Sequence, residues 1–524
     1  MKADKRIEND LGCKPQTTGV VIVGNGPAGI SLSYQLAGNR PYFKGRSHHD
    51  DILNLKLQEK LKVSLVDQDI EYLSEGLEGR SSNPVALLFD TLARPMADLG
   101  QDHETHLSWK YESSEAIPHV VLGRGPPGGA WQMMKGEMLT LSLGSWMELP
   151  DCSFKQFLHK LHVANSSGRP RSGTMTGMPP PGVVPSVNRA SVADVASYYQ
   201  HYVRANKLEP FFRDACTVTS VRRLPARGHH VYDCESGELE TDGCWEEEKG
   251  EDEEDEEEEG EEPLWEVRGF EDRGSGAVMP FCYHAANVVL ATGTFDRQNR
   301  LAVDGESCAI VHHSVAELGA LLASGDLARD PNPVLIVGAG LSAADAVLAA
   351  LERGVRVLHA FRRDARDREL VFARLPTALY PEYHRVHAMM RGDEAAAAGG
   401  GYRAFARHRV HSIRDDGRVV LASVDGEMFT TVRTSRVVVL VGSAPDLAFM
   451  PSGGRHLGVH ADQPIDGKRN RFDADCVTYE SAKERGLFAM GALVGDTFVR
   501  FIVGGALGIA ATLARRRKLL AAER

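Results

Sequence analysis

The chain has 524 residues, of which 42% are apolar and 25% charged, values typical of a globular protein with more than one core. Its formal net charge of −12 is concentrated in residues 246–262, which hold fourteen acids and one lysine. The rest of the chain is close to neutral, which argues against a nucleic-acid-binding surface.

Eight scattered cysteines include no C-x-x-C pair. This argues for a reducing, cytoplasmic location, against a structural metal site, and against a dithiol oxidoreductase. The segment Met1 to Lys14 is polar and charged, so no secretory signal is expected there, and we interpret residues 1–17 as an N-terminal tail.

The first predicted element is a buried strand, Val20 to Val23, which runs into the pattern Gly24-x-Gly26-x-x-Gly29 and then into a helix. A strand, a tight glycine turn and a helix start together form a pyrophosphate site, because free amide groups and the positive helix end face the anion. A single such motif also occurs as a turn that binds nothing.

Two later segments compete for the second strand of this unit. One is Lys62 to Asp67 and the other is His119 to Arg124. Only the first ends in a carboxylate, so Asp67 is our candidate for binding the ribose hydroxyls.

The acidic run 246–262 cannot bury apolar surface and repels itself, so we expect a disordered, solvated loop rather than a site for a basic partner. Further along, a predicted strand over Asn287 to Leu290 runs into Ala291-Thr292-Gly293. Thr292 and Gly293 are candidate cofactor-binding residues.

A second glycine turn follows a second buried strand. Val334 to Val337 leads into Gly338-x-Gly340-x-x-Ala343, with Ser342 as a further candidate for cofactor binding. Two turns in the right context predict two dinucleotides, FAD on one unit and NAD(P)H on the other, which is the arrangement of a hydride relay.

The nature of the second dinucleotide follows from charge. After the strand Val355 to Phe361, the position that carries an acid in an NAD site is followed by Arg362 and Arg363. A guanidinium binds a 2′-phosphate through parallel hydrogen bonds, so NADPH is favoured over NADH; the alternative is a pair of surface arginines.

After a last strand, Val437 to Val441, the chain continues into Gly486 to Gly491 and then Asp496. Asp496 is a candidate for accepting hydrogen bonds from the ribityl hydroxyls, with a surface helix cap as the alternative. The apolar stretch Phe501 to Leu513 is too short to cross a membrane, and we expect a packed helix.

This layout predicts an α/β protein in which an NADPH-binding Rossmann domain is inserted into an FAD-binding Rossmann domain. The expected division is an FAD-binding part over 18–302, an NADPH-binding domain over 303–440, and a second FAD-binding part over 441–524.

The segment Arg124-x-x-x-Gly128-Gly129-Ala130-Trp131 resembles, with one residue fewer in the gap, the R-x-x-x-x-G-G-x-W segment of class B flavin monooxygenases and amino-acid N-hydroxylases. The resemblance implies that Arg124, Gly129, Trp131 and Gln132 bind the flavin; plain core packing is the alternative for Trp131. Gly123 stands where those enzymes have a ribose-binding acid, and Ser145 near their substrate-binding lysine, so an amino-acid substrate is not supported.

Longer strings, Tyr72 to Ser81, Pro84 to Asp90 and Ile117 to Arg124, resemble the oxidative stress-induced growth inhibitor family. The resemblance implies a regulator of growth, proliferation and cell death with an FAD- and NADPH-dependent monooxygenase body, of the type in which dioxygen adds at the flavin C4a. The substrate would be a small molecule or a protein side chain, protein partners would belong to growth control, and no catalytic residue is assigned. Two other functions remain open, an NADPH oxidase that releases hydrogen peroxide and a regulatory protein with a vestigial flavin fold.

Overall fold

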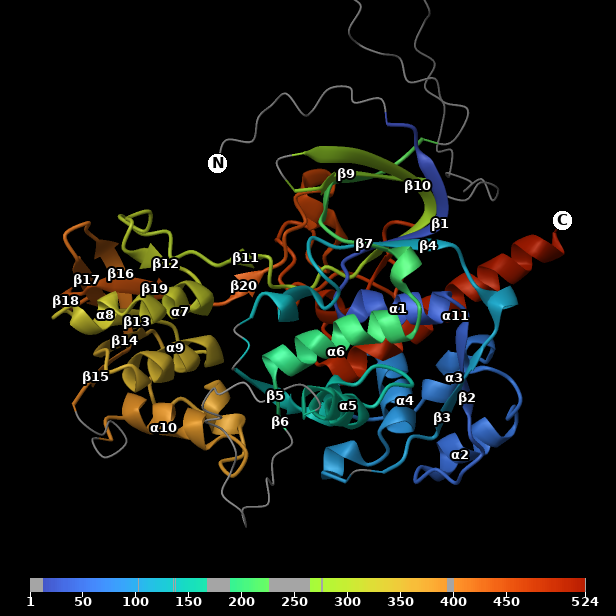
Figure 1. Cartoon of the computed structure of the whole chain (residues 1–524), viewed down its shortest axis with the longest axis horizontal. Coiled ribbons are helices and arrows are strands. Elements are labelled where there is room, and N and C mark those ends of the chain that lie inside the picture. The colour runs from blue at the N-terminus through green and yellow to red at the C-terminus, as the bar shows by residue number, and fades with distance from the viewer. Residues whose placement is uncertain are drawn as a thin grey trace, which may run out of the picture.

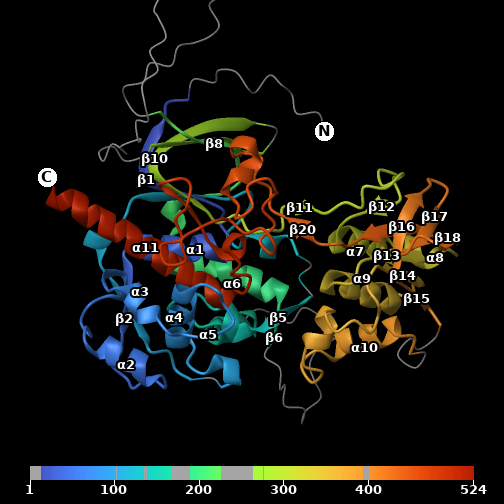
Figure 2. The same cartoon turned by 180° about the vertical axis from the view of Figure 1, so that it is seen from behind.

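The computed structural model describes residues 13–101, 103–134, 136, 138–166, 189–225, 264–274, 277–393 and 400–523. The acidic run 246–262 and residues 1–12 of the predicted tail lie outside these ranges. The described residues form two lobes, which Figures 1 and 2 show from opposite sides.

The larger lobe contains a parallel sheet with the strand order β7-β4-β1-β10-β21. In chain order this is 3-2-1-4-5, as in dinucleotide-binding folds. Residues 20–23 of the central strand are buried, because neighbouring strands pair with it on both sides and the sheet is covered. The strands are β1 (Gln16–Val23), β4 (His119–Leu122), β7 (Phe212–Arg213), β10 (Val278–Leu290) and β21 (Leu487–Ala489).

Strand β10 takes part in both the parallel sheet and an antiparallel extension of it. Its second half pairs with β1 and β21 in the parallel sheet, and its first half pairs with β9 (Trp265–Asp272), which pairs in turn with β8 (Cys216–Arg223). These three strands form an antiparallel extension of the sheet, at the top of Figure 1.

Two helices lie side by side against this sheet. Helix α1 (Pro27–Leu36) starts at the first glycine turn, and α11 (Val499–Ala522) packs along it. The predicted packed helix is therefore present, and nearly every residue from 499 to 514 is buried. Within the described part of the chain we find no helix with the length and hydropathy that a membrane span requires.

Smaller elements complete the larger lobe. They are the helices α2 (Asp51–Gln58), α3 (Ile70–Ser74), α4 (Pro84–Ala93), α5 (Phe154–Ser166) and α6 (Val192–Ala205), and the antiparallel strand pairs β2 (Asn39–Phe43) with β3 (Leu107–Tyr111) and β5 (Leu139–Leu143) with β6 (Arg189–Ser191).

The predicted strand Lys62 to Asp67 is wrong. Residues Leu65–Asp67 form a short 3-10 helix, η2, and the Ser64 side chain caps it by accepting a hydrogen bond from the Val66 amide. A capping serine satisfies a free amide of a helical turn, and here it outweighs the strand-like alternation of the segment. The second strand of the unit is β4, because it pairs with β1 in parallel over its whole length.

The smaller lobe has its own core around a second parallel sheet, β12-β19-β13-β14-β15. Its strands are β12 (Val311–His312), β13 (Val334–Val337), β14 (Val357–Phe361), β15 (Tyr402–Ala406) and β19 (Arg436–Val439). Around it lie α7 (Val315–Ser324), α8 (Asp326–Arg329), α9 (Leu341–Glu352) and α10 (Pro381–Met390), and an antiparallel sheet of β16 (His408–Ile413), β17 (Arg418–Ser423) and β18 (Phe429–Arg433).

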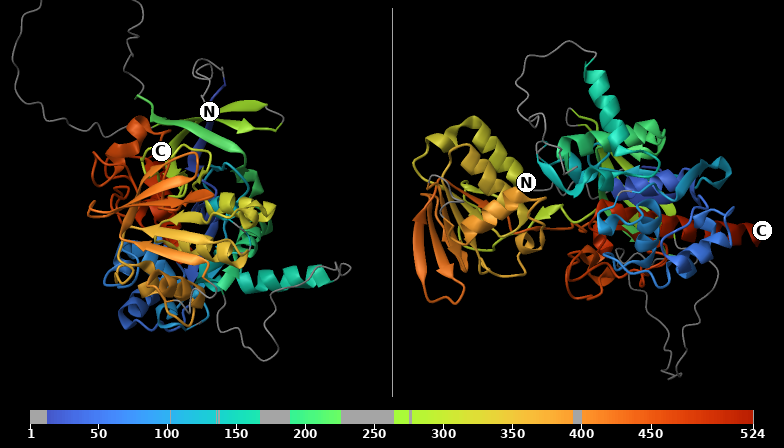
Figure 3. Two further views of the ribbon diagram at one scale, coloured as in Figure 1. Left: turned by 90° about the vertical axis from the view of Figure 1, so that its left-hand side faces the viewer. Right: turned by 90° about the horizontal axis from the view of Figure 1, so that it is seen from below.

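Two crossing segments join the lobes, as Figure 3 shows. They pair with each other as the antiparallel strands β11 (Arg297–Gln298) and β20 (Ser443–Ala444). Strand β21 completes the first sheet only after the whole second sheet has been formed by the chain. The predicted insertion of one Rossmann unit into another is thus confirmed.

Candidate functional site

The first glycine turn brings together the ends of β1 and β10 and the start of α1. Gly24 has φ +116°, and a Cβ built on it would lie 2.3 Å from the Ala291 carbonyl oxygen. A Cβ on Gly29 would lie 2.0 Å from the Gly24 carbonyl oxygen. Both positions therefore exclude any larger residue, for reasons of backbone conformation and close approach.

The second predicted flavin segment packs directly on this turn. The Gly128 amide donates to the Asn25 carbonyl oxygen at 2.9 Å, and a Cβ on Gly129 would lie 2.9 Å from the Gly26 Cα. Gly129 also has φ +58°. Two glycine segments about a hundred positions apart in the sequence thus form one backbone surface.

This surface fits a pyrophosphate group. Gly26 is the N-cap residue of α1, no side chain caps the helix there, and a Cβ at Gly26 would meet nothing closer than 3.9 Å. Beside it, the Thr292 hydroxyl oxygen is buried without a hydrogen-bond partner. A buried polar group without a partner is unfavourable, so a ligand that bonds this hydroxyl would stabilise the site. Gly293, with φ +72°, follows it at the strand end.

Gly123, where the resembling enzymes have an acid, lies against the Asn25 side chain. A Cβ at Gly123 would lie 2.0 Å from the Asn25 side-chain nitrogen, so the asparagine fills the space next to this glycine. The Asn25 amide donates to the Gly125 carbonyl oxygen at 2.6 Å and to Asp214 at 3.3 Å. Asp214 follows β7, and burial raises its pKa. Sequence reasoning missed Asp214, although its place directly after a strand was a possible signal.

The structure places Asp67 elsewhere. Its carboxylate forms ion pairs with Arg40, which follows α1, and with Lys518 near the end of α11, at 2.7 Å. Burial by itself would raise the pKa of Asp67, but hydrogen bonds from Lys518 and Arg40 lower it. Helix α1 starts at the glycine turn and ends beside Ile117, before the start of β4. Asp67 therefore lies near the N-terminal ends of the strands, whereas the glycine turn lies at their C-terminal ends. That part of the prediction is corrected.

The other residues of the flavin-like segment are held by protein contacts. Arg124 is exposed, and its guanidinium lies 3.4 Å from Asp296, which follows β10. Trp131 is half-buried, with its ring centroid 6.4 Å from that of Tyr199 in α6. The Gln132 amide donates to the Pro127 and Ala196 carbonyl oxygens at 2.7 and 2.9 Å. Gln132 therefore ties the segment to α6.

Asp496 is 2% exposed, which excludes the surface helix cap that the sequence left open; the cap residue of α11 is Phe498. The Asp496 amide donates to the Gly491 carbonyl oxygen at 3.0 Å, and a Cβ at Gly491 would lie 3.5 Å from that of Ala28 in α1. Asp496 thus lies close to the start of α1. Burial raises its pKa to about 6.

The second glycine turn repeats the geometry of the first. Gly338 has φ +138°, and a Cβ on it would lie 2.2 Å from the Leu440 carbonyl oxygen. Gly340 is the N-cap of α9 and has open space around it, and Ser342 is exposed in the first turn of the helix. Buried Ala343 takes the place of the third glycine.

A histidine that sequence reasoning missed supports this second turn. His359 on β14 contacts the Gly338 carbonyl oxygen through Nε2 at 2.7 Å and the Tyr402 hydroxyl through Nδ1 at 2.8 Å. Burial lowers its pKa to about 4, so the ring is neutral at physiological pH. No glycine pattern in the sequence indicates such a contact from the neighbouring strand.

The two arginines after β14 differ in their surroundings. The Arg363 guanidinium lies 2.7 Å from Asp367, whereas Arg362 is exposed and forms no ion pair in the described part of the chain. Arg362 is therefore the better candidate for a 2′-phosphate.

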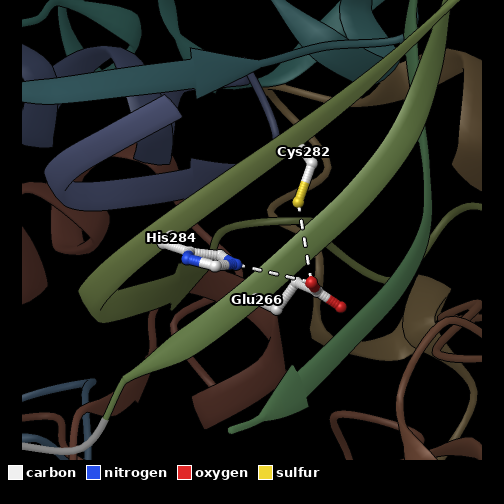
Figure 4. Close-up of side chains that lie close together, drawn as sticks. All are labelled: Glu266, Cys282 and His284. Carbon is white, nitrogen blue, oxygen red and sulfur yellow. Dashed lines mark hydrogen bonds and ion pairs between the residues drawn. The ribbon is translucent and has the colours of Figure 1, made fainter. Parts of the chain in front are cut away.

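Glu266, Cys282 and His284 converge on the antiparallel extension (Figure 4). The Glu266 carboxylate lies 3.6 Å from the Cys282 sulfur and 3.4 Å from His284 Nε2, but Arg222 and Arg268 also bind it, each at 2.8 Å. Burial by itself would raise the pKa of Glu266, but hydrogen bonds from these arginines lower it to about 2. Two guanidinium groups would repel a bound cation, so we interpret the cluster as a structural ion-pair network.

Comparisons with known proteins agree with this architecture. Residues 281–464 match a family model described as pyridine nucleotide-disulphide oxidoreductase. The human oxidative stress-induced growth inhibitors 2 and 1 are 45% and 43% identical to the chain over 95% of its length, and the matches cover 94% and 95% of those proteins. A Caenorhabditis elegans homologue of that inhibitor is 28% identical over 94% of the chain and 93% of the homologue.

Solved structures show the same fold at low sequence identity. The chain superimposes on a bacillithiol disulfide reductase from Bacillus cereus with a TM-score of 0.54 and 16% identity, covering 96% of the chain and all of that structure. An ornithine N-hydroxylase from Kutzneria gives a TM-score of 0.53 with 15% identity and the same coverage.

Proposed function

The chain belongs to the oxidative stress-induced growth inhibitor family, and from this premise we propose that it is an FAD- and NADPH-dependent monooxygenase that acts in the control of growth, proliferation and cell death. One observation carries the proposal. Two glycine turns, on separate parallel sheets, each place an uncapped helix N-terminus beside open space.

The larger lobe would hold FAD. The backbone of Gly24, Gly26 and Gly129 would face its pyrophosphate, and Thr292 would use its free hydroxyl as a hydrogen-bonding group. Asp496 would accept hydrogen bonds from the ribityl hydroxyls. Trp131 would form part of the wall beside the ring system, with Arg124, Gln132 and Gly293 around it.

The smaller lobe would hold NADPH. Gly338, Gly340 and Ser342 would contact its pyrophosphate, and Arg362, with Arg363 behind it, would bind the 2′-phosphate. When bound, the two cofactors supply the hydride and oxygen chemistry, and the protein positions them and excludes water. We therefore assign no protein side chain as acid or base.

We further propose that residues 18–302 and 441–524 form the FAD-binding part and residues 303–440 the NADPH-binding part. The substrate would be a small molecule or a protein side chain, reached in a reducing, cytoplasmic setting. Protein partners in growth control would bind the reaction products or the surface of this enzyme.

An anaerobic titration of the purified protein with NADPH tests the proposal. A functional flavin will lose its yellow absorbance as NADPH is added, and a vestigial one will remain oxidised. If the flavin is reduced, oxygen uptake is compared with peroxide release in the presence of candidate substrates. A monooxygenase that oxygenates a substrate releases less peroxide than the oxygen it consumes, whereas an NADPH oxidase returns all of it as peroxide. A protein that cannot be loaded with FAD contradicts the proposal.

A further inference from the structure

The Asp496 carboxylate is held on both of its oxygens by a segment far away in the sequence. The Ser81 hydroxyl donates to one oxygen at 2.7 Å, and the Asn83 amide donates to the other at 2.7 Å. The Tyr479 hydroxyl is a third, longer contact at 3.4 Å. We infer that Ser81 and Asn83 are positioning residues that orient the Asp496 carboxylate toward the ribityl chain of FAD, an inference that rests on the proposed function.

The arrangement leaves Asp496 able to bind a ligand. An ionised carboxylate has about four lone-pair sites. Ser81 and Asn83 occupy one on each oxygen, and the longer Tyr479 contact takes a second on the oxygen bonded by Asn83, so the oxygen bonded by Ser81 keeps a free site. The Asp496 backbone lies close to the start of α1 through its hydrogen bond to Gly491, and the proposed pyrophosphate site is at the same helix start.

The segment that carries the two donors is itself fixed. The Ser81 hydroxyl also accepts a hydrogen bond from the Asn83 amide nitrogen of the backbone, at 3.0 Å. Pro84 starts α4 directly afterwards, and α4 is tied to α11 by an ion pair between buried Asp90 and Arg500 at 3.0 Å. Both donors therefore come from a rigid support, as a preorganised site requires.

Few charged or titratable groups face the carboxylate. They are Tyr479, whose pKa burial raises so that it stays neutral, and Arg471, whose guanidinium lies over Gly495. Burial raises the pKa of Asp496, and the hydrogen bonds from Ser81 and Asn83 oppose this rise. Loss of either donor should therefore raise the pH at which Asp496 takes up a proton and no longer accepts a ribityl hydrogen bond as a carboxylate.

The test uses the full chain and FAD as the probe. FAD affinity is measured between pH 5.5 and 8.5 for the wild type, Ser81→Ala, Asn83→Ala and the control Ser82→Ala. Ser82 is the adjacent exposed hydroxyl, and it bonds Arg471 instead of Asp496. We expect each of the first two variants to weaken FAD binding about ten-fold or more, as for a hydrogen bond to a charged group. The pH midpoint of FAD release should move upward in both, and Ser82→Ala should match the wild type.

Ser81→Thr, which keeps the hydroxyl, should restore both the affinity and the pH midpoint. Unchanged affinity in Ser81→Ala and Asn83→Ala overturns the inference, and so does a lower affinity with an unmoved pH midpoint, because that result indicates a purely structural role. The far-UV circular dichroism and melting temperature of each FAD-free variant verify that the larger lobe is folded. If Asn83→Ala fails this check, the comparison of Ser81→Ala with Ser81→Thr decides. A wild-type protein that binds no FAD refutes the proposed function itself.

Discussion

Arg189 on β6 of the larger lobe forms an ion pair with Glu382 on α10 of the smaller lobe, at 2.5 Å. The Arg189 guanidinium also lies over the Tyr380 ring, 4.8 Å from its centroid, and the Tyr380 hydroxyl donates to the Leu141 carbonyl oxygen on β5. The arginine side chain is 4% exposed. Together with the β11–β20 pair, this contact fixes the orientation of one lobe relative to the other.

We expect Arg189→Ala to slow the reduction of bound FAD by NADPH about ten-fold or more, because small errors in the placement of reacting groups have large effects on rate. Stopped-flow spectroscopy measures this rate, and small-angle scattering measures the change in lobe arrangement. Arg46→Ala is a suitable control, since Arg46 pairs with Glu104 on the surface of the larger lobe alone. An unchanged reduction rate in Arg189→Ala would show that the ion pair does not set the lobe geometry.

Gly26→Ala and Gly340→Ala should each abolish the binding of one cofactor without destabilising the fold. Gly26 has φ −71° and Gly340 φ −95°, values that alanine adopts, and an added Cβ meets no atom closer than 3.9 Å at Gly26 and none within 4 Å at Gly340. The added methyl groups would instead face the bound pyrophosphates. We expect Gly26→Ala to lose FAD but to keep NADPH binding, and Gly340→Ala to show the reverse, with melting temperatures of the empty proteins near that of the wild type. Loss of both cofactors in either variant would contradict the assignment of separate sites.

Arg362→Ala should raise the KM for NADPH at least ten-fold while leaving the KM for NADH nearly unchanged, because only NADPH carries the 2′-phosphate. Arg363→Ala is the matched comparison, and its effect should be smaller, since Asp367 already holds that guanidinium. Steady-state rates with both nucleotides measure the two ratios. Equal losses with NADPH and NADH would refute the role of Arg362.

Two buried carboxyl groups, Asp496 and Asp345, should each contribute stability to the FAD-free protein that is lost as pH rises from about 4 to about 6. The pKa values of Asp496 and Asp345 are raised from 3.8 to about 6 by burial, so the folded state binds protons more tightly than the unfolded state in this range. For Asp496 alone the difference is on the order of 3 kcal/mol at neutral pH.

Asp496→Asn removes this carboxyl, so its melting temperature relative to that of the wild type should rise between pH 4.5 and pH 7. Asp345→Asn is the control, with an effect of the same sign but no loss of FAD binding. A variant whose melting temperature falls relative to that of the wild type between pH 4.5 and pH 7 would contradict the assigned pKa direction.

Sequence patterns predicted the parts of the site that depend on local geometry. The glycines at positions 24, 29 and 338 each meet a neighbouring carbonyl oxygen too closely for a side chain, and this need leaves a visible pattern in the sequence. The insertion was also predictable, because a strand signal with glycine ends occurs after the second unit is complete.

Contacts between distant segments left no such signal. Ser81 and Asn83 bind Asp496 across more than four hundred positions, and nothing near position 81 marks them as partners. Two segments were candidates for the second strand, and pairing with β1 decides between them. A carboxylate at position 67 carries no information about that pairing. Asn25 fills the space beside Gly123, and this relation also depends on the tertiary structure.

The shared strand β10 has a consequence for synthesis on the ribosome. The side of β10 that pairs with β21 stays unpaired while residues 291–486 are synthesised. The smaller lobe can therefore fold as a unit before β21 completes the larger sheet. Until then, Val288 to Leu290 present an open, apolar strand edge, which is a template for pairing with other chains. Nascent chains stalled in the smaller lobe should therefore depend on chaperones more than the finished protein does.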